Sequence, residues 1–347
     1  MTLNATGNSL RTFLTRLTRS EDLSRAEAGL LLEALLDRAA TDAQIAGVLI
    51  ALKLKSETVE ELAGLAEGMR ARAVRIRTRH ECFIDTAGTG SSSAKTFNVS
   101  TAAAFVIAGA GLPVAKHGNR AASSRCGSAD VLAALGVDVS APPDLSEKCL
   151  DDIGICFMFA PLYHGTTARV AGVRRELGVQ TTFNLLGPLT NPARAPRQII
   201  GVSDGHLVEP LARTLALIGT EHSWVVHGAD GLDEITISDK TFVAEAKQGR
   251  VRTFEIEPEQ FGLERSSLDT LSGCDANESA AIIRSILAGA RRDAARLLVV
   301  INAAAALHVG GVAEHLQQGA RMAEQSIDSG AAQGKLDELI RTSSAAR

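Results

Sequence analysis

Residues 1–78 carry apolar side chains at helical spacing, and polar residues that favour helix starts separate the apolar runs. Ser24–Glu27 and Thr41–Gln44 each fit a capping box, in which two side chains bond the backbone at a helix start. The apolar positions that follow lie three or four residues apart: Leu31, Leu32, Leu35 and Leu36, then Ile45, Val48, Leu49 and Leu52. Ser56 is expected to cap a further helix that ends near Arg72. We predict a small all-helical N-terminal domain, which serves as a dimerisation surface or as a lid.

Beyond residue 79 the pattern changes to short β-branched or aromatic runs that alternate with helical segments. Strands are expected at 82–85, 113–116, 156–159, 198–202, 223–227 and 241–245. Such alternation is typical of βαβ units on a mostly parallel sheet, so the fold class is α/β. The runs 241–245 and 251–256, separated by Gly249, could instead form an antiparallel hairpin, and residues 277–340 return to helices.

Two loops rich in glycine and hydroxyl groups each follow a predicted strand and precede a helix. The first, over residues 85–101, reads DTAGTGSSSAKTFNVST, and the second, over 116–130, reads KHGNRAASSRCGSAD. Glycines let the backbone approach an anion, and a helix start supplies free N–H groups and a positive dipole end. Neither loop fits the P-loop or the GxGxxG pattern. Two such loops in succession predict a site for a large polyanionic ligand.

Further charged residues add two ligand contacts to this prediction. Asp233 and Glu234 are adjacent carboxylates after a predicted strand, and carboxylate and phosphate oxygens are the ligands that Mg²⁺ prefers. An acidic pair is common on protein surfaces, but a polyphosphate ligand normally arrives with Mg²⁺. Arg174 could hold a carboxylate as a bidentate partner. Residues 182–192 read as a loop rich in turn residues, and the histidines show no spacing that predicts a zinc site.

Composition narrows the function classes. The 347 residues are 45% hydrophobic and 22% charged, with a formal net charge of −4. This mild acidity argues against a general nucleic-acid-binding protein, which would be basic. The five cysteines lack metal-like spacing, and the three in apolar context, Cys82, Cys149 and Cys156, are interpreted as reduced core residues of a cytoplasmic protein. Neither a signal peptide nor a membrane span is expected, because the most apolar stretches are short and interrupted.

Four motifs together resemble those of the anthranilate phosphoribosyltransferase family. They are KHGNRxxSSxxGSAD at 116–130, NVST at 98–101, QTTFNLLGPLTNP at 180–192 and GLDE at 231–234, and the likeness covers most of the chain. The resemblance implies a Mg²⁺-dependent pentosyltransferase that moves the phosphoribosyl group of phosphoribosyl pyrophosphate onto the amine of anthranilate. This reaction releases pyrophosphate and is the second step from chorismate toward tryptophan.

The family fold implied by this resemblance has two parts with the active site between them. A small helical domain would span 1–78, with about 172–192 packing into it. A large α/β domain of the nucleoside phosphorylase and phosphoribosyltransferase type, with a mostly parallel central sheet, would span 79–171 and 193–347. The small domains would form a homodimer, with no nucleic-acid or membrane partner.

Carried over position by position, the resemblance also implies three groups of site residues. Phosphoribosyl pyrophosphate would be bound by Gly88, Ser91, Ser92, Thr96, Asn98, Val99, Ser100, Thr101, Lys116, His117, Gly118, Asn119, Arg120, Ala121, Ala122, Ser123, Ser124 and Ser128. Anthranilate would contact Gly88, Asn119 and Arg174, with His117 and His164 lining its approach. Two magnesium ions per subunit would be bound through Ser100, Asp233 and Glu234. No covalent nucleophile is expected.

Two departures from the family pattern and two rival functions complete the sequence picture. Ser92 replaces an aspartate of the usual GTGGDG, which bears on magnesium affinity, and residues 165–167 replace the PAM of HPAM, which bears on the acceptor entrance. A pyrimidine nucleoside phosphorylase would have another stretch in place of KHGNR and would lack the acidic pair. A non-enzymatic nucleic-acid-binding relative would be basic and would lack GLDE and Arg174.

Overall fold

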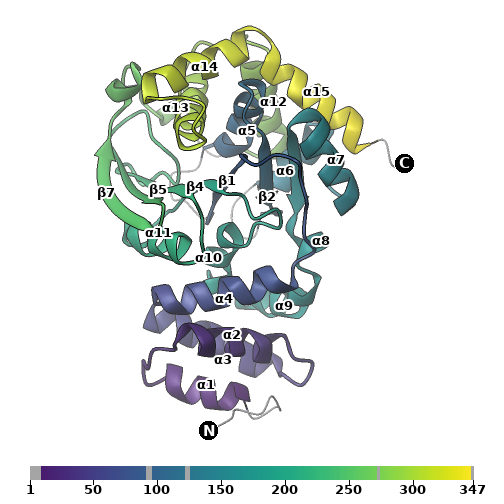
Figure 1. Cartoon of the computed structure of the whole chain (residues 1–347), viewed down its shortest axis with the longest axis vertical. Coiled ribbons are helices and arrows are strands. Elements are labelled where there is room, and N and C mark those ends of the chain that lie inside the picture. Colours follow the sequence, from purple (N-terminus) through teal and green to yellow (C-terminus); the bar gives the residue numbers. More distant parts are fainter. Residues whose placement is uncertain (1–8, 91–95, 122–125, 272–273, 345–347) are drawn as a thin grey trace.

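The N-terminal part of the protein is a layer of helices. The computed structural model describes residues 9–90, 96–121, 126–271 and 274–344. The first helices are α1 (Ser9–Leu17), α2 (Arg25–Leu36), α3 (Asp42–Lys55) and α4 (Val59–Arg72), at the bottom of Figure 1. The capping boxes at Ser24 and Thr41 are confirmed. The predicted cap at Ser56 is wrong, because Ser56 has a φ of 67° and ends α3, while Thr58 and Glu61 form the capping box of α4.

A seven-stranded sheet forms the centre of the larger part. Its strands are β1 (Ile84–Gly88), β2 (Val114–Gly118), β3 (Ile155–Phe159), β4 (Arg197–Gly201), β5 (His222–Gly228), β6 (Thr241–Lys247) and β7 (Arg250–Ile256). They lie in the order β3-β2-β1-β4-β5-β6-β7. The first five are parallel, and β5-β6-β7 are antiparallel, so the predicted parallel sheet and the predicted hairpin are both confirmed. Strand β1 lies later than predicted because its pairing with β4 continues to Gly88.

Helices cover both faces of the sheet, as a βαβ pattern requires. On one face lie α5 (Val99–Gly109), α12 (Ala276–Leu287), α13 (Ala294–Val309), α14 (Leu316–Asp328) and α15 (Ala331–Ser343), with α6 (Ser128–Ala134) and α7 (Pro143–Ile153) beside them (Figure 1). On the other face lies α11 (Val208–Leu217). Alternation along the strands divides the two cores, since Ile199 and Val226 face the first set while Ile200 and Val225 face the second.

Three helices connect the sheet to the N-terminal layer. They are α8 (Ala160–Tyr163), α9 (Ala168–Leu177) and α10 (Thr182–Leu189), and residues of α9 and α10 share a buried core with α1–α4. The predicted loop over 182–192 is therefore wrong for its first eight residues. Thr181 and Asn184 cap this helix, and the turn residues Gly187 and Pro188 fall only in its last turn. The domain boundaries at 78, 172 and 192 stay a prediction.

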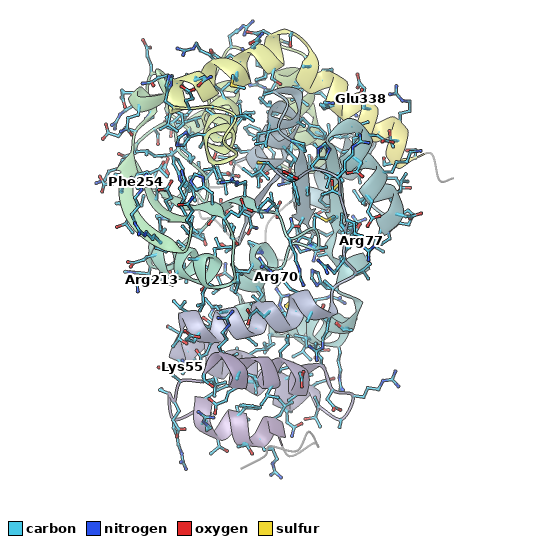
Figure 2. All side chains as sticks on the ribbon, in the orientation of Figure 1. Lys55, Arg70, Arg77, Arg213, Phe254 and Glu338 are labelled. Carbon is cyan, nitrogen blue, oxygen red and sulfur yellow. The ribbon has the colours of Figure 1, made fainter. Side chains whose placement is uncertain are left out.

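Arg70 ties α4 to the larger part of the molecule, and Figure 2 shows it between the two. Its Nε donates to the carbonyl of Leu189 at 2.7 Å, and its Nη1 donates to that of Ile218 at 3.3 Å. These carbonyls lie at the carboxyl ends of α10 and α11, where a cation is favoured by the helix dipole. Burial lowers the pKa of Arg70 to about 10, which leaves the guanidinium charged at neutral pH.

The antiparallel end of the sheet contains a buried acid, Glu245 on β6. Its carboxylate accepts hydrogen bonds from His222 Nε2 at 2.8 Å, Trp224 Nε1 at 3.0 Å and Arg252 Nε at 2.5 Å. Burial raises the pKa of Glu245, but these donors outweigh burial and bring the pKa down to about 2. The network holds β5, β6 and β7 together.

Among the described residues, no helix is both long and apolar enough to cross a membrane.

Candidate active site

A cavity of about 340 Å³ lies beyond the carboxyl ends of β1 and β2. Here the strand order reverses, because β2 and β3 follow β1 on one side and β4 lies on the other. In parallel sheets, ligands bind at such a switch point. The two predicted phosphate loops, the acidic pair and Arg174 all reach this one cavity.

The sixteen predicted site residues that line the cavity come from distant parts of the chain. They are Gly88, Thr96, Asn98, Val99, Ser100, Thr101, Lys116, His117, Gly118, Asn119, Arg120, Ala121, Ser128, Arg174, Asp233 and Glu234. His164 is not among the lining residues, but its ring centroid lies 5.2 Å from that of His117. Ser91, Ser92, Ala122, Ser123 and Ser124 lie outside the described residues.

The amino end of α5 opens into the cavity beside a buried lysine. Val99, Ser100 and Thr101 form the first turn of α5 and line the cavity, so its positive dipole end faces the ligand space. Lys116 on β2 is only 4% exposed, and its Nζ donates to the carbonyl of Thr86 and lies 3.4 Å from Ser100 Oγ. Helix N–H groups and an ammonium thus converge where an anion would lie.

Two carboxylates, Asp85 and Glu234, lie near the Lys116 ammonium. Burial raises the pKa of Asp85 to about 6, although Lys116 opposes the rise. Burial and the neighbouring Asp233 carboxylate raise the pKa of Glu234 to about 8. Burial in turn lowers the pKa of Lys116, against the attraction of both acids. A positive charge added beside Glu234 would therefore lower the pKa of this carboxyl group and favour its ionised form.

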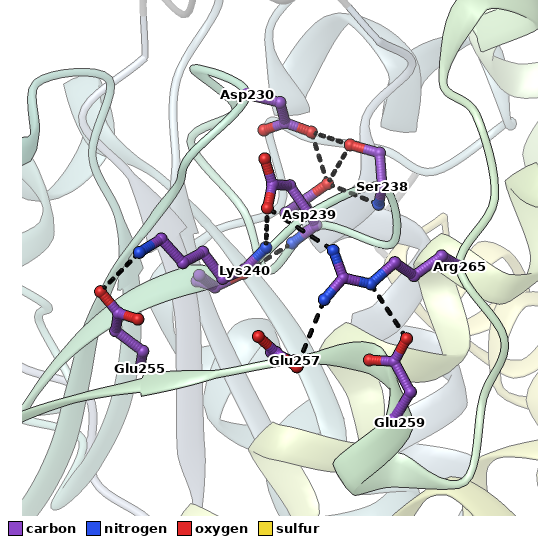
Figure 3. Close-up of polar contacts among 10 residues, drawn as sticks. Asp230, Ser238, Asp239, Lys240, Glu255, Glu257, Glu259 and Arg265 are labelled. Atoms are coloured by element: carbon purple, nitrogen blue, oxygen red, sulfur yellow. Dashed lines mark hydrogen bonds and ion pairs between the residues drawn. The ribbon is translucent and has the colours of Figure 1, made fainter.

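The acidic pair is carried by the irregular segment 229–240 between β5 and β6. Asp230 braces this segment, since its carboxylate accepts from the backbone of Leu232 at 3.1 Å and from the hydroxyls of Thr236 and Ser238 at 2.5 and 2.6 Å (Figure 3). Gly201 at the end of β4 lies so close that a Cβ there would overlap the carbonyl oxygen of Asp233. Glycine is therefore needed at position 201 for the acidic pair to pack against the sheet.

Asp130 shapes the second loop. Its carboxylate accepts from the backbone N–H groups of Ala121 and Gly127, both at 3.0 Å, and from Arg120 Nη1 at 2.9 Å. Asn98 links this loop to the first, because its Nδ2 donates to the carbonyl of Cys126 at 3.4 Å. The described parts of the two loops are thus linked by side chains that bond backbone groups.

The cavity wall also has an end that α9 and α10 contribute, through Arg174 on α9 and Phe183 and Asn184 on α10. Arg174 Nη2 donates to Asn184 Oδ1 at 3.0 Å, and its guanidinium lies 5.6 Å from the ring centre of Phe183. Its Nε is buried and has no hydrogen-bond partner within the described ranges. Burial lowers the pKa of nearby His117 to about 3, so that imidazole is neutral at physiological pH. This end of the cavity offers a cation and an aromatic face.

Some cavity residues were missed by the sequence interpretation. Phe183, Asn184, Gly187 and Pro188 of α10 line the cavity, although 182–192 was read only as a loop. The signal was present as Thr181 followed by Asn184, which is the spacing of a helix cap. Cys126 and Cys274 also line the cavity, and Cys126 lies within the predicted second loop, although neither cysteine was predicted as a site residue.

Comparison with known proteins shows which family the chain belongs to. A family model described as the α/β domain of a glycosyl transferase family matches residues 80–333, and one described as the helical bundle domain of that family matches residues 11–73. The chain therefore has both parts of this glycosyl transferase family, the helical bundle domain and the α/β domain.

Individual relatives narrow this class. Anthranilate phosphoribosyltransferase from Moorella thermoacetica is 50% identical over 331 residues, which is 95% of this chain and 97% of that protein. The crystal structure of the Thermus thermophilus enzyme of the same name has a TM-score of 0.89 at 37% identity, covering 96% of this chain and 99% of that one. The Saccharomyces cerevisiae enzyme in complex with phosphoribosyl pyrophosphate and Mg has a TM-score of 0.89 at 28% identity, covering 98% and 99%. This chain belongs to the anthranilate phosphoribosyltransferase family, so the predicted family and fold class are confirmed.

Proposed function

We propose that this protein transfers the phosphoribosyl group of phosphoribosyl pyrophosphate to anthranilate. The anthranilate amine forms a bond to C1 of the ribose, the bond from C1 to the pyrophosphate oxygen breaks, and the amine loses a proton. The observation that carries the proposal is a single cavity with two different ends. One end has a helix amino terminus, Lys116 and the acidic pair, and the other has Arg174 beside Phe183.

The phosphate end suits the pyrophosphate and the ribose phosphate. Lys116, Arg120 and the first turn of α5 supply positive charge and N–H donors, and we assign the remaining residues of the two loops to the same ligand. This assignment includes Ser91, Ser92, Ala122, Ser123 and Ser124, which lie outside the described residues. Stabilising charge on the leaving pyrophosphate is the main catalytic demand, and fixed cations and dipoles meet it without reorganisation.

The acidic pair suits magnesium. Asp233 and Glu234 are hard oxygen donors on the cavity wall, and Ser100 lies beside them because its N–H donates to Glu234 Oε1 at 3.1 Å. No group of three or more His, Cys, Asp or Glu side chains that could hold a metal occurs among the described residues. Ligand phosphates and water would therefore complete the shell, as is usual for Mg²⁺. When bound, the cation neutralises charge on the pyrophosphate, and we propose two ions per subunit.

Arg174 suits the acceptor carboxylate, with Gly88 and Asn119 also contacting anthranilate. An arylamine is neutral at pH 7, so its lone pair attacks without a strong base, and orientation supplies much of the rate. His117 and His164 line this approach in the proposal, and because burial lowers the pKa of both, they add no positive charge that competes with Arg174. No covalent nucleophile takes part.

We further propose that the protein is a cytoplasmic homodimer formed through its helical N-terminal part. Support for the dimer comes from Leu30 on α2 and Leu54 on α3, which are 42% and 79% exposed. Contact of these leucines with a second copy of the chain would remove their apolar surface from water. Light scattering coupled to gel filtration distinguishes a dimer from a monomer, and charged substitutions at both leucines should shift a dimer to monomer.

The test of the activity follows the loss of anthranilate fluorescence when phosphoribosyl pyrophosphate and Mg²⁺ are added to the pure protein. We expect turnover by the natural chain and none by a variant with Asp233→Ala and Glu234→Ala, whose circular dichroism should be unchanged. Near-normal turnover by that double variant at ordinary Mg²⁺ concentration would contradict the cation assignment. Absence of turnover by the natural chain would contradict the proposed activity itself.

A further inference from the structure

The segment that carries Asp233 and Glu234 needs support from outside itself. It lies in neither a helix nor a strand between Gly228 and Thr241. It holds two adjacent acidic side chains on a stretch that has no regular backbone hydrogen bonding of its own. The geometry of the acidic pair therefore depends on contacts with neighbouring elements, which act as anchors.

Asn302 on α13 is such an anchor. It is 5% exposed, and its Oδ1 accepts from the backbone N–H of Ile235 at 3.0 Å. Its Nδ2 donates to the carbonyl of Ile235 at 2.9 Å and to that of Leu298 at 2.8 Å. One amide thus satisfies both polar backbone groups of Ile235, the residue directly after Glu234, much as a neighbouring strand would.

The helix behind Asn302 is a rigid base. Every residue of α13 from Leu298 to Leu307 is buried, and all of them are leucine, valine, isoleucine or alanine except Asn302. Helix propensity does not favour asparagine there, and burying an amide costs free energy unless its hydrogen bonds are made. The hydrogen bonds to Ile235 offset the cost of burying the Asn302 amide, so this polar side chain serves to bind the segment that carries the acidic pair.

The other anchors hold different parts of the same segment. Asp230 braces Leu232, Thr236 and Ser238 from within the segment, as Figure 3 shows for Ser238. Gly201 gives room to the backbone of Asp233 but bonds nothing through a side chain. Asn302 connects the backbone next to Glu234 to a helix 67 residues away in sequence.

We infer that Asn302 is a positioning residue that holds Asp233 and Glu234 at the cation site. The inference rests on the proposed function, because it takes the acidic pair to be the magnesium ligands. Groups that orient metal ligands without touching the metal change metal affinity or activity about 10- to 100-fold when removed. Loss of Asn302 should therefore weaken the cation site far more than the anthranilate site.

The experiment measures binding of Mn²⁺, as a spectroscopic substitute for Mg²⁺, to the full chain in the presence of phosphoribosyl pyrophosphate. Electron paramagnetic resonance reports the free Mn²⁺, and initial rates give the anthranilate KM at saturating cation. Asn302→Leu removes the amide at similar volume, and Asn302→Ser is a smaller polar change. Leu307→Ala, a buried cavity variant on the same helix, controls for loss of stability.

For both Asn302 variants we expect Mn²⁺ affinity to fall about tenfold or more, with the anthranilate KM changed less than twofold. Leu307→Ala should keep the natural Mn²⁺ affinity. Affinity in the Asn302 variants that matches the natural chain, or falls no further than in Leu307→Ala, would overturn the inference. Failure of both Asn302 variants to fold while Leu307→Ala folds would overturn it too, because Asn302 would then act on stability alone.

A fourth variant separates this inference from the proposed function. With Asp233→Asn and Glu234→Gln combined, Mn²⁺ binding in the presence of phosphoribosyl pyrophosphate should be lost. If that variant binds Mn²⁺ like the natural chain, the cation assignment fails, and the role of Asn302 fails with it. If it loses Mn²⁺ while the Asn302 variants do not, only the role of Asn302 fails.

Discussion

Arg174→Met is the sharpest test of how the acceptor is recognised. The guanidinium is fixed by Asn184 on one side and packs over Phe183, while its Nε is buried without a partner within the described ranges. Methionine keeps much of the volume but removes the charge and every donor. A carboxylate in contact with this group would lose its charged hydrogen bonds in a site that water reaches poorly.

The size of the effect follows from that burial. Removing one partner of a buried charged pair costs roughly 2–5 kcal/mol, and each 1.4 kcal/mol is tenfold in affinity. We therefore expect the anthranilate KM to rise about 30-fold or more, while the KM for phosphoribosyl pyrophosphate changes less than about threefold. Asn184→Ala removes the bond that orients Nη2, worth about 0.5–1.5 kcal/mol, and also the bond from the Thr181 N–H that caps α10. Its effect on the same KM should be about 2- to 10-fold.

The assay compares two acceptors, anthranilate and aniline, by initial rates at saturating phosphoribosyl pyrophosphate and Mg²⁺. Aniline has the same amine but no carboxylate, so it is the internal control. The natural chain should prefer anthranilate strongly, and Arg174→Met should lose most of this preference while its rate with aniline stays close to natural. If both substrate KM values rise together, or if the preference for anthranilate survives, Arg174 does not hold the carboxylate.

Three further predictions concern the contacts around this site. Arg70→Met leaves two helix-end carbonyls unpaired, so urea denaturation should show a loss of about 2 kcal/mol, and an unchanged midpoint would contradict the clamp. Glu245→Gln should lower the free energy of unfolding by up to about 3 kcal/mol at neutral pH, because the pKa of Glu245 in the folded protein is about 2. The difference between the two proteins should be complete above about pH 5 and should disappear as the pH falls toward 2. A difference that does not depend on pH would exclude ionisation of Glu245 as its source. Ser92→Asp should increase the Mg²⁺ dependence of the initial rate or introduce inhibition at high Mg²⁺, and superimposable rate curves would show that the substitution is neutral.

The regular elements were predictable because their signals are local. Ser24 and Thr41 cap helices through residues three positions away, and the strand runs are short, apolar and bounded by turn residues. Where two local signals competed, the sequence misled. Ser56 and Thr58 are both acceptable caps, and the left-handed backbone at Ser56 decided between them. Gly187 and Pro188 suggested a loop, but the cap at Thr181 and burial between the N-terminal helices and the sheet gave α10.

The site was predictable in its ligand-facing residues and not in its support. Loops at the ends of parallel strands meet at one edge of the sheet, so Lys116 and Asp233 could be placed in one cavity from motifs alone. Asn302 and Asp85 act through a few hydrogen bonds to residues tens of positions away, which no local pattern encodes. A lone asparagine in the apolar run of α13 was nevertheless a usable signal, because a buried amide must find partners.

The two ends of the cavity are built by different parts of the fold, and this division has a functional consequence. The phosphate end belongs to the sheet, where Lys116 and the first turn of α5 are fixed by the parallel strands. The acceptor end belongs to α9 and α10, whose apolar sides pack with the N-terminal helices. Arg70 holds the carboxyl end of α10. A change in packing between the N-terminal helices and the α/β part should therefore displace Arg174 more than Lys116. Under the proposed function, a variant with weaker packing at this contact would lose affinity for anthranilate, while its affinity for phosphoribosyl pyrophosphate would stay close to that of the natural chain.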